Sequence, residues 1–148
     1  MVAVHGEVDI HASAAEVLDV LADLPAYPRW SSVHKRVSIN DLGRDGRAHR
    51  ATMTVTAAGL ADEQILDYAW TKRGVSWSLV KAGQQRDQHG QYTINQRDGV
   101  AHVTYDLDIR PAIPLPGIVV RQVMKKAVAA ATEGLRDRVE SLTATQPR

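Results

Sequence analysis

The sequence contains no cysteine and no phenylalanine, and only 5% of its 148 residues are aromatic. The lack of cysteine rules out disulfide bonds and thiolate chemistry and gives no support to an oxidising compartment, so we expect a cytoplasmic protein. No segment comes near the roughly 20 consecutive apolar residues that cross a bilayer. We therefore expect a protein without an integral membrane segment.

Neither acidic nor basic residues are in excess. Acidic and basic residues are interspersed along the chain, and the formal net charge is +1 at pH 7. Arg44, Arg47 and Arg50 stand close together in sequence, but acids stand beside them and no series of aromatic residues is interleaved with them. Nucleic-acid-binding surfaces concentrate positive charge and often add aromatic stacking platforms. The sequence therefore predicts no nucleic-acid partner.

Catalytic and cofactor motifs are also missing. The sequence contains no G-x-S-x-G, no H-E-x-x-H and no glycine-rich phosphate or dinucleotide loop. His5 and His11 share one strand parity, but at 3.3 Å per residue they stand roughly 20 Å apart, too far to hold one metal ion. A structural or surface role is expected for the histidines. We assign no catalytic residue and no metal ligand, and we expect no cofactor.

The length predicts one ordinary domain over residues 1–148. Apolar and polar residues alternate from Val2 to His11, which predicts a half-buried strand. The segment Ser13–Glu16 has the sequence of a capping box, in which a serine hydroxyl and a glutamate carboxylate bond the free amides of a helix start. A short helix therefore follows, and Pro25 ends it.

Turn sequences divide the middle of the chain into segments of strand character. They are GRDG at Gly43–Gly46, AAG at Ala57–Gly59, KRG at Lys72–Gly74 and RDG at Arg97–Gly99. In the clearest segment, Val100–Arg110, apolar and polar residues alternate strictly. Six strands linked by hairpins, together with the first strand, predict one antiparallel sheet.

A long amphipathic helix is predicted from Ile118 to Leu142, after a connection that holds three prolines. At 1.5 Å per residue it is about 37 Å long, enough to cross a small sheet diagonally. An antiparallel sheet with one apolar face must be covered, and this helix is the only long cover available. The predicted fold class is α+β.

The middle of the helix stripe that should face the sheet consists of small residues, namely Ala127, Val128, Ala131 and Gly134, with Ala130 beside them. Two explanations are open. Small side chains under a curved sheet leave volume, which is how apolar ligand pockets are made. They also allow a helix to approach a sheet closely. The pattern alone does not choose between these explanations.

The corner after the first helix concentrates Tyr27 and Trp30 beside Pro25 and Pro28. Prolines restrict the backbone angles, so the two rings should be held rigidly. Either the rings plug one end of a solid core or they frame the mouth of a cavity.

The order of these elements resembles that of the START-like helix-grip superfamily of polyketide cyclases/dehydratases and lipid-transport proteins, also known as SRPBCC. The resemblance covers nearly the whole chain and lies in SAAEVLDVLADLPAYPRW (residues 13–30), VSWSLV (75–80) and PAIPLPG (111–117) before a terminal amphipathic helix. It implies a seven-stranded antiparallel curved sheet wrapped around the long C-terminal helix, with two short helices between strands 1 and 2. It also implies an apolar cavity between sheet and helix, closed at one end by the Tyr27–Trp30 corner.

Three hypotheses about function follow. The first is binding or carriage of a hydrophobic small molecule of lipid, polyketide or isoprenoid type in that cavity. The second is a polyketide cyclase, aromatase or dehydratase that acts in the same cavity. The third is a protein-interaction module with a filled core and an exposed apolar patch.

Strand and helix periodicity select the residues that would line the cavity. The predicted ligand-binding residues are Tyr27, Trp30, Met53, Val55, Tyr68, Trp70, Trp77, Tyr92, Tyr105, Met124, Val128 and Leu135. An enzyme would draw its acid/base groups from the polar side chains that parity turns inward. These are Gln64, Tyr68, Tyr92, Tyr105 and His49.

Overall fold

The computed structural model describes residues 2–144. Seven antiparallel strands form one sheet in the order β1-β7-β6-β5-β4-β3-β2. The strands are β1 (Val2–Ile10), β2 (His34–Leu42), β3 (Ala48–Ala57), β4 (Leu60–Thr71), β5 (Gly74–Ala82), β6 (Gln85–Arg97) and β7 (Val100–Pro111). The helical elements are α1 (Ala14–Ala22), the 3₁₀ helix η1 (Leu24–Arg29), α2 (Gly117–Ala129), the π-helical turn η2 (Ala130–Gly134) and α3 (Leu135–Ala144). The predicted α+β architecture is confirmed.

Hairpins determine the strand order. β2 to β7 follow one another as neighbours, and β1 pairs with β7, in a register from Val2 opposite Ile109 to Ile10 opposite Ala101. At the RDG turn, Asp98 and Gly99 have φ angles of 52° and 78°. Two consecutive positive φ angles are the geometry of a tight two-residue hairpin, and the glycine adopts its angle without steric cost.

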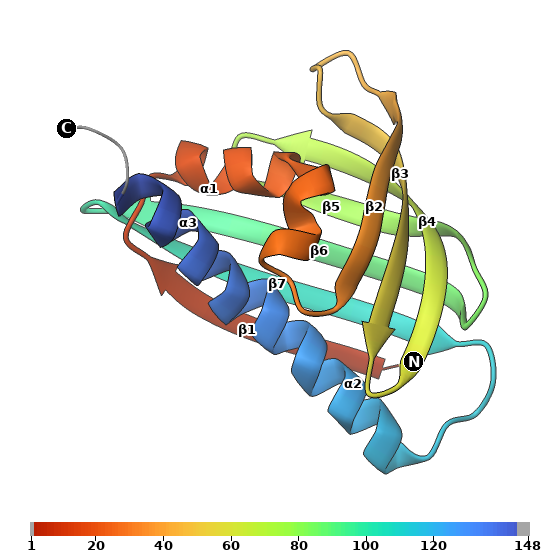
Figure 1. Ribbon diagram of the computed structural model, residues 1–148. Helices are drawn as coiled ribbons and strands as arrows, with labels where there is room; N and C mark the ends of the chain where they lie inside the picture. Colours follow the sequence, from red (N-terminus) through yellow and green to blue (C-terminus); the bar gives the residue numbers. More distant parts are fainter. Residues whose placement is uncertain (1, 145–148) are drawn as a thin grey trace.

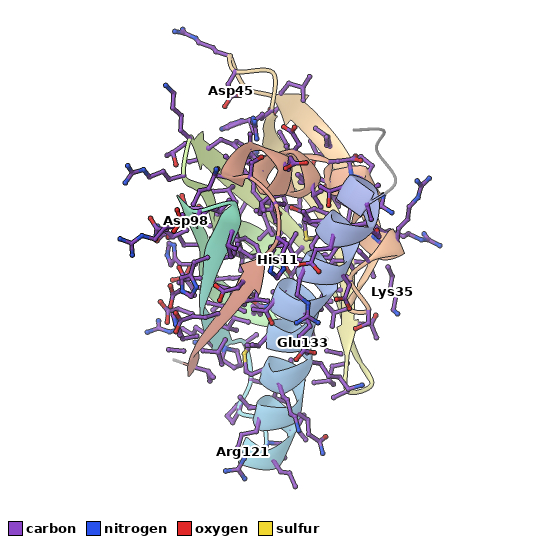
Figure 2. The ribbon with its side chains drawn as sticks, turned by 90° about the vertical axis from the view of Figure 1, so that its left-hand side faces the viewer. His11, Lys35, Asp45, Asp98, Arg121 and Glu133 are labelled. Carbon is purple, nitrogen blue, oxygen red and sulfur yellow. The ribbon has the colours of Figure 1, made fainter. Side chains whose placement is uncertain are left out.

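The strands bend around the C-terminal helices, which cross one face of the sheet diagonally, while α1 and η1 lie over one end of that face (Figure 1). The strand side chains that parity turned inward form the main core together with α1 and α3. Among the largest fully buried side chains are Ile10, Leu21, Leu24, Met53, Ile94, Val103, Leu135 and Val139. Charged side chains project from the outside of the molecule (Figure 2). None of the helices within residues 2–144 combines the length and the hydropathy of a membrane-spanning segment.

The capping box at the start of α1 is present. The Ser13 hydroxyl accepts the backbone N–H of Glu16 at 3.1 Å, and the Glu16 carboxylate accepts the N–H of Ser13 at 2.9 Å. After α1, Pro25 lies in the first turn of η1, and the Tyr27 hydroxyl donates to the Leu21 carbonyl. The Tyr27 and Trp30 rings meet edge to face with their centroids 5.0 Å apart. The corner therefore holds both rings in place, as the prolines predicted.

The C-terminal helix is interrupted where a single regular helix was predicted. Residues 130–134 form a π turn between α2 and α3, and the Tyr92 hydroxyl donates to the carbonyl of Ala131 within it at 2.8 Å. A side chain from the sheet thus bonds the helix backbone at this turn. A Cβ on Gly134 would lie 2.8 Å from the Trp30 carbonyl oxygen. At Gly134, close approach is therefore the reason for a small residue.

Candidate functional site

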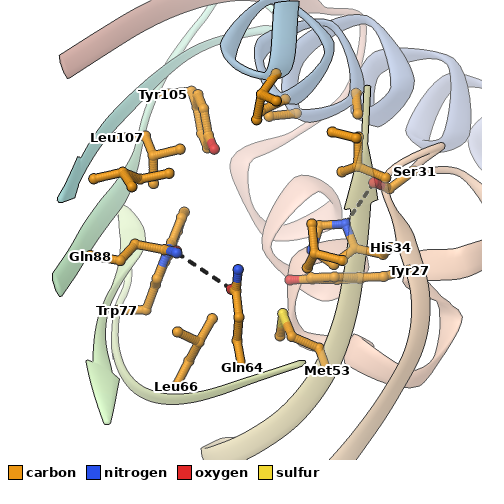
Figure 3. A pocket seen from close by; sticks show the side chains of 18 of the residues that line it. Tyr27, Ser31, His34, Met53, Gln64, Leu66, Trp77, Gln88, Tyr105 and Leu107 are labelled. Carbon is orange, nitrogen blue, oxygen red and sulfur yellow. Dashed lines mark hydrogen bonds between the residues drawn. The ribbon is translucent and has the colours of Figure 1, made fainter. Parts of the chain in front are cut away.

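A cavity of about 120 Å³ lies between the inner face of the sheet, the corner after α1 and the helix formed by α2 and η2 (Figure 3). Its wall is mostly aliphatic and aromatic, with a few polar groups, which is the usual composition of a ligand site. Nine of the twelve residues predicted to bind ligand line it: Tyr27, Trp30, Met53, Val55, Tyr68, Trp77, Tyr92, Tyr105 and Met124. The structure brings these residues together, and their contact with a ligand stays a prediction.

The other three predicted residues do not line this cavity. Trp70 faces inward, but it lies at another part of the sheet, where its indole N–H donates to the Ala48 carbonyl at 2.8 Å. Val128 packs against Gly6 of β1, where an added Cβ would lie 2.7 Å from the valine Cγ1. Leu135 is fully buried in the core. Parity identified the correct face for Trp70 but could not indicate how far along β4 the cavity extends.

Both explanations for the small helix residues hold, at different positions. Ala127, Ala130 and Ala131 line the cavity, so their short side chains leave room there. Gly134, further along, lies against the backbone of Trp30. The helix therefore makes space at one point of its length and packs tightly at the next.

A second cavity of about 100 Å³ adjoins the first near the start of α2. Val123 and Met124 of α2 and Ile109 of β7 belong to both linings. Apolar cavities of about 150 Å³ admit a benzene-sized molecule, whereas sites for drug-sized ligands measure roughly 300 to 1,000 Å³. Each cavity alone is smaller than these, so a ligand of more than one ring would have to occupy both.

One polar group of the larger cavity is a histidine that the sequence analysis did not select. The Nδ1 atom of His34 lies 2.6 Å from the Ser31 hydroxyl, and its ring meets that of Tyr27 edge to face at 5.3 Å. Both residues of the pair line the cavity. Burial lowers the pKa of His34 to about 4, because the charged imidazolium loses hydration. The imidazole is therefore neutral at pH 7.

The histidine that was predicted to face inward does not do so. The side chain of His49 is 52% exposed, and its Nδ1 lies 3.0 Å from the Asp41 carboxylate on β2. The pairing of β2 with β3 shifts register on both sides of Asp41. Ala48 and Ala51 are both buried although they lie an odd number of positions apart, and His49 is exposed. The alternation of buried and exposed side chains along β3 is therefore interrupted between Ala48 and Ala51. Such an irregularity moves a side chain to the other face of a strand.

Glutamines form the polar group at another part of the wall. The Trp77 indole N–H donates to Gln88 Oε1 at 2.9 Å, and Gln88 Nε2 donates to Gln85 Oε1 at 2.8 Å and to Gln64 Oε1 at 3.4 Å. Gln64 and Gln88 are 4% and 6% exposed, and both amides point into the cavity in Figure 3. Gln64 was expected from parity, whereas Gln88 was missed because the strand pattern is weak in the polar first half of β6.

The tyrosines of the wall fall into two groups. Tyr27 and Tyr92 donate to backbone carbonyls. The hydroxyls of Tyr68 and Tyr105 make no hydrogen bond to another residue in 2–144, and Tyr105 points its hydroxyl into the cavity (Figure 3). Burial raises the pKa of all four phenols above the ordinary value. They are therefore neutral and can donate hydrogen bonds.

A curved antiparallel sheet closed around a C-terminal helix, with an apolar cavity between them, defines a helix-grip protein of the START-like class. The family model described as polyketide cyclase / dehydrase and lipid transport matches residues 1–144, and the chain belongs to this family. No curated protein sequence matches the chain.

Solved structures share this fold at low sequence identity. A START superfamily protein from Mycobacterium smegmatis superposes with a TM-score of 0.84 at 23% identity, covering 95% of this chain and 98% of that one. A Thermus thermophilus protein gives 0.83 at 18%, with coverages of 98% and 100%. An aromatase/cyclase from a Streptomyces species gives 0.81 at 15%, with coverages of 94% and 93%. At these identities the likeness is one of fold.

Proposed function

We propose that this protein binds a hydrophobic small molecule, of lipid, polyketide or isoprenoid type, in the cavity between the sheet and α2. The observation that carries the proposal is an apolar and aromatic cavity whose helix side is lined by the short side chains of Ala127, Ala130 and Ala131. Burial of ligand hydrocarbon would drive binding at about 25 cal/mol per Å² before ordering costs. The description of the family, which names lipid transport, supports the same class of function. The single domain over residues 1–148 and the cytoplasmic location stay predictions.

Binding is favoured over catalysis by the electrostatics of the wall. General acid/base catalysis works best with a group whose pKa lies near the operating pH. Burial lowers the pKa of His34 to about 4 and raises the pKa values of Tyr68 and Tyr105. All three pKa values therefore lie further from pH 7 than those of the free side chains. The wall is suited to holding and orienting a molecule. A cyclase or dehydratase acting in the same cavity is the alternative.

A filled-cavity variant tests the proposal. Ala127→Leu adds three carbon atoms to a side chain that lines the cavity, so we expect it to weaken binding of the uncharged fluorophore N-phenyl-1-naphthylamine by at least about tenfold. Ala129→Leu is the matched control, because Ala129 lies on the same helix with its side chain exposed. Titration followed by fluorescence gives both affinities, and circular dichroism checks the fold.

Equal affinities for the two variants would contradict a site in this cavity. Native mass spectrometry of the purified protein, followed by extraction, would identify any retained molecule. Incubation of the protein with that molecule separates the two functions. If the molecule is recovered unchanged, the result supports binding. If it is recovered as a cyclised or dehydrated product, the result supports the alternative.

A further inference from the structure

The wall of the larger cavity offers hydrogen bonds but no charge. Its lining, as far as the structure describes it, includes tyrosine, tryptophan, glutamine, serine and histidine, but no Asp, Glu, Lys or Arg. The one titratable base, His34, is neutral at pH 7 because burial lowers its pKa to about 4. A carboxylate or phosphate taken out of water needs a counter-ion to offset its lost hydration. This wall contains none.

The unpaired polar groups of the wall include donors that need an acceptor. The hydroxyls of Tyr68 and Tyr105, two residues of the lining, have no hydrogen-bond partner among residues 2–144, and that of Tyr105 points into the cavity (Figure 3). A carbonyl or hydroxyl oxygen on the ligand would supply what these groups lack.

Part of the wall is flat and fixed. The Trp77 ring lies 6.0 Å from Tyr68, 5.8 Å from Tyr92 and 6.1 Å from Tyr105, measured between centroids. Its indole rests directly on Gly90, where a Cβ would come within 2.0 Å of the ring. Because the indole N–H is also bonded to Gln88, this ring is held in one orientation. Rigid aromatic faces pack well against rings.

These three observations point to one ligand chemistry. We infer that the cavity takes an uncharged, ring-containing molecule that presents carbonyl or hydroxyl oxygens to the wall, and that it does not take the anionic head of a fatty acid or phospholipid. This inference rests on the proposed function and narrows its ligand class.

A pair of ligands with the same shape and different charge tests the inference. 2-Naphthamide and 2-naphthoate differ in that a neutral amide replaces a carboxylate. At pH 7.5 we expect the intact protein to bind the amide at least about tenfold more tightly, a difference of about 1.4 kcal/mol. Isothermal titration calorimetry, or displacement of N-phenyl-1-naphthylamine, measures both affinities.

A charge-introducing variant gives a second, independent readout. Gln64→Lys places an ammonium group on a buried side chain of the wall, so we expect the preference for the amide over the carboxylate to fall or reverse. Gln91→Lys is the matched control, because Gln91 is exposed on the neighbouring part of the same sheet, and it should leave the preference unchanged.

The outcomes are distinct. Equal or tighter binding of 2-naphthoate to the unmodified protein overturns the inference while the proposed function stands. Failure of the amide, the carboxylate and N-phenyl-1-naphthylamine alike to bind counts against the proposed function itself. The comparison between ligands does not depend on folding of the Gln64→Lys variant, so the inference is tested even if that variant is unstable.

Discussion

At the scale of the residue, two histidines show how environment decides a role. His34 lines the cavity beside Ser31, and burial lowers its pKa to about 4. His49 stands half exposed beside Asp41. Nothing in the local sequence separates them, since both lie near the start of a strand, directly after an apolar residue and before a basic one. The difference comes from the corner after α1, which covers His34, and from the register shift that turns His49 outward.

The lowered pKa of His34 predicts a loss of stability in mild acid. The pKa of a histidine in the unfolded chain is near 6.5. Between about pH 6.5 and 4, His34 is therefore protonated in the unfolded state but neutral in the folded state. The contribution of His34 is therefore complete above pH 6.5 and is lost as the pH falls towards 4. In urea denaturation at pH 7.5 and 4.5, we expect His34→Gln to lose less stability on acidification than the unmodified protein. Parallel losses in the two proteins would show that His34 titrates normally.

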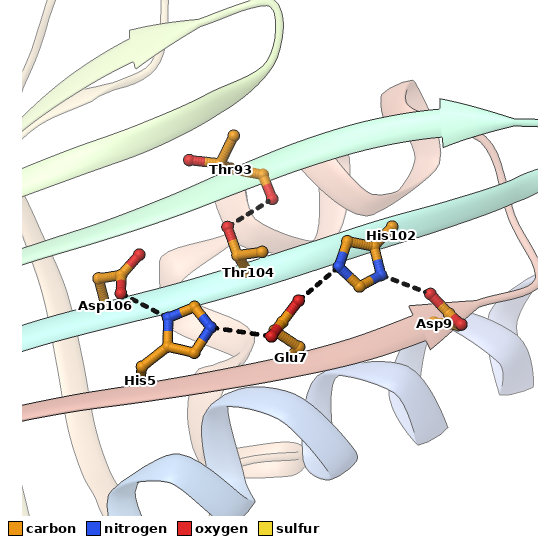
Figure 4. A network of polar contacts seen from close by, with 7 residues as sticks. All are labelled: His5, Glu7, Asp9, Thr93, His102, Thr104 and Asp106. Carbon is orange, nitrogen blue, oxygen red and sulfur yellow. Dashed lines mark hydrogen bonds and ion pairs between the residues drawn. The ribbon is translucent and has the colours of Figure 1, made fainter.

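At the scale of the element, the edge strand β1 is tied to β7 by a row of side chains on the outer face of the sheet (Figure 4). The ring of His5 bridges Asp106 at 2.6 Å and Glu7 at 3.0 Å. The ring of His102 bridges Asp9 at 2.7 Å and Glu7 at 2.8 Å. Glu7 is thus shared by both histidines. Hydrogen bonds to these carboxylates raise the pKa of His5 and of His102.

The stability contributed by His5 and His102 depends on pH in the opposite direction to that contributed by His34. A histidine whose folded pKa is raised contributes stability below its unfolded pKa, near 6.5, and loses it as the pH rises through the folded value. Glu7→Gln removes the shared partner, so NMR titration should show a lower pKa for both His5 and His102. Glu63→Gln, an exposed carboxylate of β4, should leave both unchanged. A shift in only one of the two histidines would mean that Glu7 is not shared.

At the scale of the whole molecule, the two adjoining cavities set the size of ligand that fits. Met124 of α2 is 6% exposed and belongs to both linings, so its side chain is part of what separates them. An unbranched thioether is also the side chain that most easily changes shape to admit a ligand. We therefore expect a change in the Met124 side chain to enlarge the site without movement of the sheet.

Truncation of this side chain should join the cavities. Met124→Ala is expected to lower the free energy of unfolding by about 2 to 5 kcal/mol while increasing the affinity for N-phenyl-1-naphthylamine relative to 2-naphthamide. Met53→Ala is the control, because Met53 is also buried and, of the two cavities, lines only the larger. Met53→Ala should lower the free energy of unfolding by a similar amount without increasing the relative affinity for N-phenyl-1-naphthylamine. If both variants increase that relative affinity equally, Met124 does not separate the two cavities.

Short-range patterns in the chain specify the elements and the face that each one buries. The capping box at Ser13, the RDG turn at Asp98 and the alternation in Val100–Arg110 all depend on residues a few positions apart, so they are visible in the chain. With the hairpin order, these local signals were enough to predict the seven-stranded sheet, the covering helix and the inward-facing side chains, whereas the cavity was expected from the family resemblance.

Where along each element the cavity begins and ends depends on how the elements pack in three dimensions. Parity assigns Trp70 and Tyr68 to one face of β4 alike, yet only Tyr68 reaches the cavity. The volume of the space, the π turn at Ala131 and the burial of His34 depend on contacts between segments far apart in sequence. Periodicity reports which way a side chain points, whereas sheet curvature and register decide what it meets there.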